Sequence, residues 1–176
     1  MKKLMIAALA VAFSAVAGAA TVNWSASDIS AYPGGLDKDR NTYVAYLFDT
    51  SAGADTIATA VKGGDMSVLS KALGSKALTS AGKVFGGKAE NAPYNIGDYV
   101  TAFAVVLNNA TPKDATYFLV TDEVTSTSGV SSQGAVTVTL GSQASAKWDA
   151  VAVPEPTSGL LLLIGVAGLA LRRRRA

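Results

Sequence analysis

Three oxygen-bearing side chains at alternate positions, Asp37, Asp39 and Asn41, have the spacing in this sequence that best suits ligand binding. Alternate carboxylate and amide oxygens on a loop can converge on Ca²⁺. A complete calcium loop has Gly at its sixth position and Glu at its twelfth, where this chain has Thr42 and Phe48. The two basic residues between the acidic ones also offset the local negative charge. The pattern therefore favours a solvated turn, with three weak metal-ligand candidates and no cofactor.

The composition argues against an enzyme. The chain contains no cysteine and no histidine, which rules out thiolate catalysis, Cys-ligated zinc and the Ser-His-Asp triad. The adjacent carboxylates Asp122 and Glu123 fall in a stretch with strand character, where neighbouring side chains point to opposite faces. They are expected to be solvated rather than to act together on one substrate. We therefore expect no catalytic residues.

The positive charge of the chain lies at its two ends. The formal net charge is +2, yet residues 20–153 contain nine basic and twelve acidic side chains. A nucleic-acid-binding domain needs a basic face to neutralise phosphates. Because the central part of the chain is acidic on balance, we expect no nucleic-acid partner.

Alternation of apolar and polar residues predicts a mainly β domain. Stretches rich in β-branched and aromatic residues are separated by turn-forming segments such as YPGGLDKDRN, NNATPKDA and STSGVSSQ. This arrangement is typical of an antiparallel β-sandwich-like domain. The expected strands are residues 21–27, 42–50, 98–108, 116–124 and 134–141, with a last strand over residues 146–151 that ends the domain near Ala152.

The expected core lies on these strands, and one segment between them is helical. Ile57 and Val61, and later Leu69 and Leu73, have helical spacing within residues 55–73, which predicts one or two short helices. Asp55 and Asp65 are the expected N-caps, and glycines 63, 64 and 74 the expected breaks. Trp148 is expected to close one end of the domain. The predicted core residues are Val44, Tyr46, Phe48, Phe103, Val105, Leu107, Phe118, Val120, Val136 and Val138.

The first 19 residues have the pattern of a secretory signal peptide. Two lysines precede an apolar run, and Ala17 and Ala19 then provide the small side chains that signal peptidase requires. We expect cleavage after Ala19, with Ala20 as the alternative last residue removed. The mature chain is thus predicted to be exported through the inner membrane.

The last 24 residues combine three different features. Pro154, Glu155 and Pro156 precede an uncharged run over residues 157–171, which is followed by four arginines, Arg172, Arg173, Arg174 and Arg175. The thirteen residues from Gly159 as a helix measure about 20 Å against a hydrocarbon core of about 30 Å. The arginines are expected to extend the span by reaching lipid phosphates, and to hold this end in the cytoplasm.

In this order, these three features resemble the PEP-CTERM sorting signal of Gram-negative, biofilm-forming bacteria. The resemblance covers residues 153–176 and implies an exosortase, a membrane-embedded transpeptidase that cuts near the Pro-Glu-Pro. It also implies transient anchoring in membrane lipids, followed by transfer of the body to the cell surface or the extracellular matrix. Glu155 is then a recognition charge.

Three domains follow: a signal peptide over residues 1–19, an exported mainly β domain over residues 20–152, and the sorting signal over residues 153–176. The sequence favours a non-enzymatic surface or biofilm-matrix protein. A carbohydrate-binding module is the alternative, with exopolysaccharide as its partner, because aromatic rings often form stacking platforms for sugars. The candidate rings are Trp24, Tyr32, Tyr43, Tyr94 and Trp148.

Overall fold

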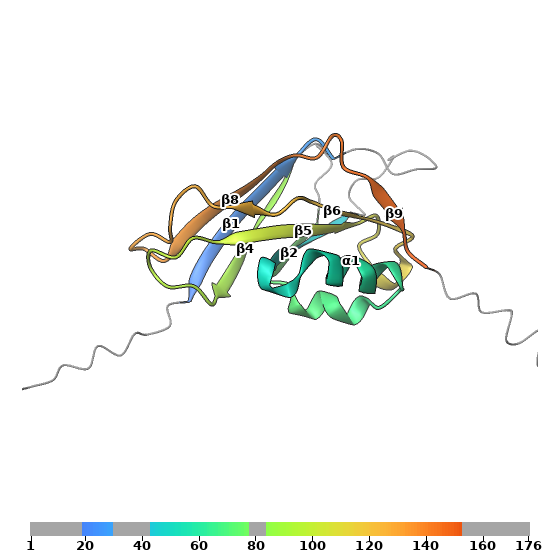
Figure 1. Ribbon diagram of the computed structural model, residues 1–176, viewed down its shortest axis with the longest axis horizontal. Coiled ribbons are helices and arrows are strands. Elements are labelled where there is room, and N and C mark those ends of the chain that lie inside the picture. Colours follow the sequence, from blue (N-terminus) through green and yellow to red (C-terminus); the bar gives the residue numbers. More distant parts are fainter. Residues whose placement is uncertain (1–18, 30–42, 78–83, 153–176) are drawn as a thin grey trace, which may run out of the picture.

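The computed structural model describes residues 19–29, 43–77 and 84–152, which form two β-sheets and a helical layer (Figure 1). The smaller sheet has the strand order β4-β1-β8, with β1 at Ala20–Ser27, β4 at Val84–Ala92 and β8 at Ala135–Ser142. The larger sheet has the order β3-β2-β5-β6-β9, and β7 also pairs with β5. Its strands are β2 at Val44–Asp49, β3 at Gly74–Ala77, β5 at Thr101–Leu107, β6 at Tyr117–Val120, β7 at Val124–Thr125 and β9 at Trp148–Ala150. The prediction of a mainly β domain with few helices is confirmed.

The predicted helical segment forms two helices on the outer face of the larger sheet (Figure 1). They are the α-helix α1 at Ala54–Lys62 and the 3-10 helix η3 at Met66–Lys71. Asp65 caps η3 as expected, but the prediction for Asp55 was wrong, because Gly53 is the N-cap of α1 and Asp55 lies in its first turn. A carboxylate there still favours the helix, since it faces the positive end of the dipole. Two further 3-10 helices are short: η2 at Thr50–Ala52 and η4 at Pro112–Asp114.

The larger sheet separates two hydrophobic cores. Alternate residues of β5 point to opposite sides, so Ala104 and Val106 face the smaller sheet while Phe103 and Val105 face the helices. The first core contains the inner faces of both sheets. The second core is built around Phe48 and Phe103, whose stacked rings lie 5.4 Å apart, and it buries the apolar face of α1.

All ten predicted core residues contribute to these cores, with Tyr46 and Val120 only half-buried. The sequence, however, predicts one core where the structure has two. The predicted residues of β2, β5 and β6 all face the helices, and the sandwich interior is lined instead by their neighbours in sequence. Those neighbours are Ala45, Leu47, Ala102, Ala104, Val106 and Leu119. Trp148 packs at this first core against Tyr43, with ring centroids 5.6 Å apart.

Strand pairing differs from the expected antiparallel arrangement in one place. β1 pairs antiparallel with β4 but parallel with β8. Two strands, β3 and β4, were not predicted, because β4 contains Gly86 and Gly87 and β3 is only four residues long. Glycine and lysine are poor strand formers, so neither stretch has a period-two pattern of large residues.

The glycines of β4 allow other segments to approach closely. A Cβ at Gly86 would lie 2.6 Å from the Trp24 carbonyl oxygen on β1, and a Cβ at Gly87 would lie 3.1 Å from the Lys76 Cβ on β3. Conversely, a Cβ at Gly74 would lie 3.1 Å from the Ala89 Cα. Gly86 thus allows the close approach of β1 to β4 within the smaller sheet, and Gly74 and Gly87 allow the two sheets to approach closely along β3 and β4.

We predict that Gly86→Ala lowers the free energy of unfolding by about 2 kcal/mol, because the new methyl group overlaps the β1 backbone. Glu90→Ala, on an exposed position of the same strand, is the matched control and should change stability by less than about 0.5 kcal/mol. Urea denaturation of both variants measures the difference. Equal stabilities of the two variants would show that β1 and β4 are not packed this closely.

Candidate functional site

The last two residues that the structure describes, Val151 and Ala152, are held by two backbone hydrogen bonds. The Val151 N–H donates to the Thr116 carbonyl at 2.9 Å, and the Ala152 N–H donates to the Lys62 carbonyl at 2.7 Å. Lys62 is the last residue of α1, where backbone carbonyls have no partner within the helix. Ala152 therefore satisfies one of these carbonyls and ties the end of the body to α1.

Gly64 makes this attachment possible. It has a positive φ of 83°, which glycine adopts without strain, and a Cβ there would lie 3.0 Å from the Ala152 carbonyl oxygen. The turn after α1 is closed by the N–H groups of Gly64 and Asp65, which donate to the carbonyls of Val61 and Ala60. Gly64, which the sequence predicts to end the helix, therefore also provides the backbone surface on which Ala152 lies.

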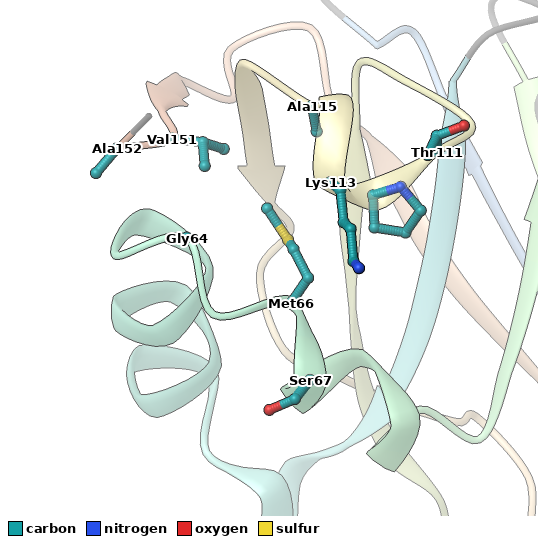
Figure 2. A pocket seen from close by; sticks show the side chains of 9 residues that line it. Gly64, Met66, Ser67, Thr111, Lys113, Ala115, Val151 and Ala152 are labelled. Carbon is teal, nitrogen blue, oxygen red and sulfur yellow. The ribbon is translucent and has the colours of Figure 1, made fainter. Parts of the chain in front are cut away.

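A cavity of about 690 Å³ opens directly beside Ala152 (Figure 2). We call it the exit pocket. One wall is formed by the segment after α1, with Gly64, Met66 and Ser67, and a second by η4 and its flanks, with Thr111, Pro112, Lys113 and Ala115. Val151 and Ala152 complete the lining. Most of the lining atoms are apolar, so the pocket suits an extended peptide with few polar groups.

Lys113 is the one charged side chain among the described residues that line the exit pocket. It extends from η4 toward η3, on the side where Met66 and Ser67 lie (Figure 2). The nearby carboxylate of Asp65 has its own partners, because it accepts hydrogen bonds from the Ser67 N–H at 3.0 Å and the Ser67 hydroxyl at 2.6 Å. These bonds lower the pKa of Asp65. The pocket thus combines an apolar wall with one positive charge.

A second hollow of about 650 Å³ lies at the other end of α1 and is acidic. Asp55, Asp122 and Glu123 all line it. The expectation that Asp122 and Glu123 lie on opposite faces of a strand is therefore wrong, because β6 ends at Val120 and both residues follow it. Among the described residues, no group of three or more acidic side chains is arranged to hold a metal ion.

Asp49 and Tyr94 join β2 to the loop after β4. The Tyr94 hydroxyl donates to Asp49, and the Ser51 N–H donates to the same carboxylate at 2.7 Å. Burial acts to raise the pKa of Asp49, but the hydrogen bonds from Ser51 and Tyr94 outweigh it and lower this pKa below its usual value. Burial, the hydrogen bond to Asp49 and its negative charge all raise the pKa of Tyr94.

The four described rings among the sugar-platform candidates are not exposed. Trp24, Tyr43 and Trp148 are buried in the first core, and Tyr94 is half-buried against it. Tyr32 lies outside the described residues. Among the described residues, the aromatic ring of Tyr99 is exposed, and no sequence signal had singled it out.

The other residues predicted from the sequence fall mostly outside the described part of the chain. Ala17, the loop with Asp37, Asp39 and Asn41, the Pro-Glu-Pro and the arginine cluster all lie there. Ala19 and Ala20 are described: Ala19 is exposed, and Ala20 begins β1 with 1% of its surface exposed. Over residues 19–29, 43–77 and 84–152, no helix has the length and apolar character to cross a membrane.

Comparison with protein families identifies the end of the chain. A family model described as the PEP-CTERM protein-sorting motif matches residues 152–175. Searches of curated proteins and of solved structures found no match to the chain. The resemblance seen in the sequence is confirmed, and the motif marks an exported protein that is sorted by an exosortase. The match begins at Ala152, the residue that is hydrogen-bonded to α1 and lines the exit pocket.

We predict that Tyr94→Phe lowers the free energy of unfolding by about 1.5 kcal/mol at pH 7, because it removes a hydrogen bond to a charged group. A carboxylate with a lowered pKa stabilises the fold above its unfolded pKa and loses this effect as the pH falls through its folded pKa. The wild-type protein should therefore lose more stability than the variant below about pH 4.

Thermal unfolding followed by circular dichroism between pH 2 and pH 7 measures this difference. Tyr99→Phe is the matched control, since that tyrosine is 64% exposed, and should behave as the wild type does. A Tyr94→Phe protein with wild-type stability at pH 7 and the same acid dependence would contradict the role given to the pair.

Proposed function

We propose that this chain is a non-enzymatic protein of the cell surface or extracellular matrix, exported by a signal peptide and released from its tail by an exosortase. The observation that carries the proposal is the sorting-motif match over residues 152–175, which begins at the last residue that the structure describes, Ala152, hydrogen-bonded to α1. The folded domain is then the cargo, and the tail is its temporary membrane anchor and cleavage signal.

The start of β1 supports signal-peptidase cleavage after Ala19. Ala20 is buried and pairs with Ala92, and the Thr21 N–H donates to the Gly134 carbonyl at 2.7 Å. Cleavage after Ala19 leaves β1 complete, whereas cleavage after Ala20 removes its first residue. Ala17 and Ala19 remain the residues that the peptidase is proposed to bind.

The tail is suited to temporary anchoring. Thirteen uncharged residues from Gly159 are about 10 Å short of the hydrocarbon thickness as a helix. Retention is therefore proposed to depend on Arg172 to Arg175 at the cytoplasmic side. Pro154 and Pro156 lack an N–H and keep the peptide around Glu155 extended, which suits recognition by a peptidase.

The non-enzymatic role proposed for residues 20–152 is argued from their composition and from the sorting motif that follows them. A chain without histidine or cysteine has few means of general acid–base or nucleophilic catalysis near neutral pH. Proteins with this sorting motif are typically non-enzymatic cargo. The alternative, a carbohydrate-binding module with exopolysaccharide as partner, is less favoured because three of the proposed platform rings are buried. Binding of residues 20–152 to a glycan array separates the two functions.

We predict that the exported protein begins at Ala20, because this end leaves β1 intact. N-terminal sequencing of the protein recovered from the cell surface measures it directly. A mature chain that still carries Met1 would contradict export by a cleaved signal peptide.

We predict that Glu155→Ala blocks processing in a host with exosortase, so that full-length protein accumulates in the membrane. Replacing Arg172 to Arg175 by serine should have the opposite signature, releasing unprocessed protein across the membrane. Glu123→Ala, an exposed carboxylate of the body, is the control and should be processed normally. Immunoblots of membrane and surface fractions measure all three. Normal trimming of the Glu155→Ala protein would overturn the sorting function.

A further inference from the structure

We propose that the exit pocket binds residues 153–156 of this same chain, with the Glu155 carboxylate against the Lys113 ammonium group. The inference deepens the proposed function, and its consequence for processing rests on it. A docked Pro-Glu-Pro is covered by the body, so an exosortase must draw the motif out of the pocket before it can cut. The pocket is then a device that limits how fast the cargo is released.

The position of Ala152 places the next residues at the pocket. Ala152 lines the cavity, and its N–H donates to the Lys62 carbonyl at 2.7 Å. Residue 153 therefore begins at the pocket wall. Glu155 is three residues further on, within about 10 Å of Ala152 even if the chain is fully extended. The motif therefore cannot leave the neighbourhood of the pocket while Ala152 stays attached.

This short tether favours the tail over any free ligand. A segment joined to the rim of its own binding site has an effective concentration on the order of millimolar. A free molecule at a lower concentration must bind correspondingly more tightly to displace it. The occupant that needs the weakest contacts is thus the chain itself.

The chemistry of the segment matches that of the lining. Val153 is apolar, and Pro154 and Pro156 have no N–H that an apolar wall would leave without a partner. Met66, Pro112 and Ala115 provide such a wall. Extended proline-containing peptides bind in apolar grooves of this kind because little conformational entropy is lost.

Charge complementarity gives the segment a direction in the pocket. Glu155 is the one charged residue in residues 153–156, and Lys113 is the one charged residue among the described residues of the lining. Two carboxylates adjoin the lining in sequence, Asp65 and Asp114, and neither of them lines the pocket. Asp65 is already hydrogen-bonded to Ser67. Lys113 is exposed, so its side chain is available to a neighbouring carboxylate.

Cross-linking of the full chain in a host without exosortase tests the docking independently of sorting. The chain contains no cysteine, so a pair of introduced cysteines reacts alone with a short bismaleimide. We expect the pair Thr111→Cys and Pro156→Cys, across the pocket, to cross-link about fivefold more than Lys62→Cys with Pro156→Cys. Lys62 is the matched control because it adjoins Ala152 but does not line the pocket.

Charge reversal tests the contact between Lys113 and Glu155. In the Thr111 and Pro156 cysteine pair, Lys113→Glu should lower cross-linking about threefold, and adding Glu155→Lys should restore it. Circular dichroism of each variant verifies that the exposed substitution leaves the body folded. In a host with exosortase, Lys113→Glu alone should be trimmed faster than the wild type.

Equal cross-linking of the pocket pair and the Lys62 pair would overturn the docking, as would a pocket pair that is insensitive to both charge changes. Failure of the proposed function has a different signature. If no exosortase acts on the chain, the cross-links form as predicted in the host without the enzyme, while trimming is absent in the host that contains it.

Discussion

The structure depends on the burial of β5 on both of its faces. Its sequence TAFAVVL alternates small residues, Ala102 and Ala104, with the larger Phe103 and Val105. The small side chains allow the second sheet to pack closely, and the larger ones fill the core beneath α1 and η3. A central strand that is covered on both sides has a continuous apolar sequence rather than a polar alternation. Without the helical layer, one whole face of the larger sheet would be exposed to water.

That helical layer also holds Ala152, the last residue that the structure describes, in a defined place. α1 lies on the sheet because Ile57 and Val61 are buried in the second core. Its last carbonyls are therefore fixed in position, and one of them accepts the hydrogen bond of Ala152. Packing at the centre of the domain thus determines the position of Ala152. The sorting motif begins at this point, beside a pocket whose walls are the turn after α1 and the helix η4.

The sequence predicts the strands better than their arrangement, for reasons that particular residues make clear. Val44, Phe48 and Phe103 are recognisable as core residues because they are large and alternate. Ala45 and Ala104 are small and not recognisable in this way, so the sequence did not predict that they line the interior between the two sheets. β4 was missed because its two glycines are selected for close approach, which leaves no period-two signal. The parallel pairing of β1 with β8 joins residues more than a hundred positions apart, which no local pattern encodes.

The same contrast holds for the functional site. The Pro-Glu-Pro, the apolar run and the arginines are adjacent in the sequence, so the motif is recognised without a fold. The exit pocket gathers residues near positions 65, 113 and 151, and Met66 or Lys113 has no feature that distinguishes it before folding. The central claim, that a folded body ends at a motif which an exosortase cuts, is tested most directly by the intact mass of the exported wild-type protein. We predict a chain that begins at Ala20 and ends close to Pro156 in a host with exosortase. A mass that includes the arginine cluster in that host would contradict the account.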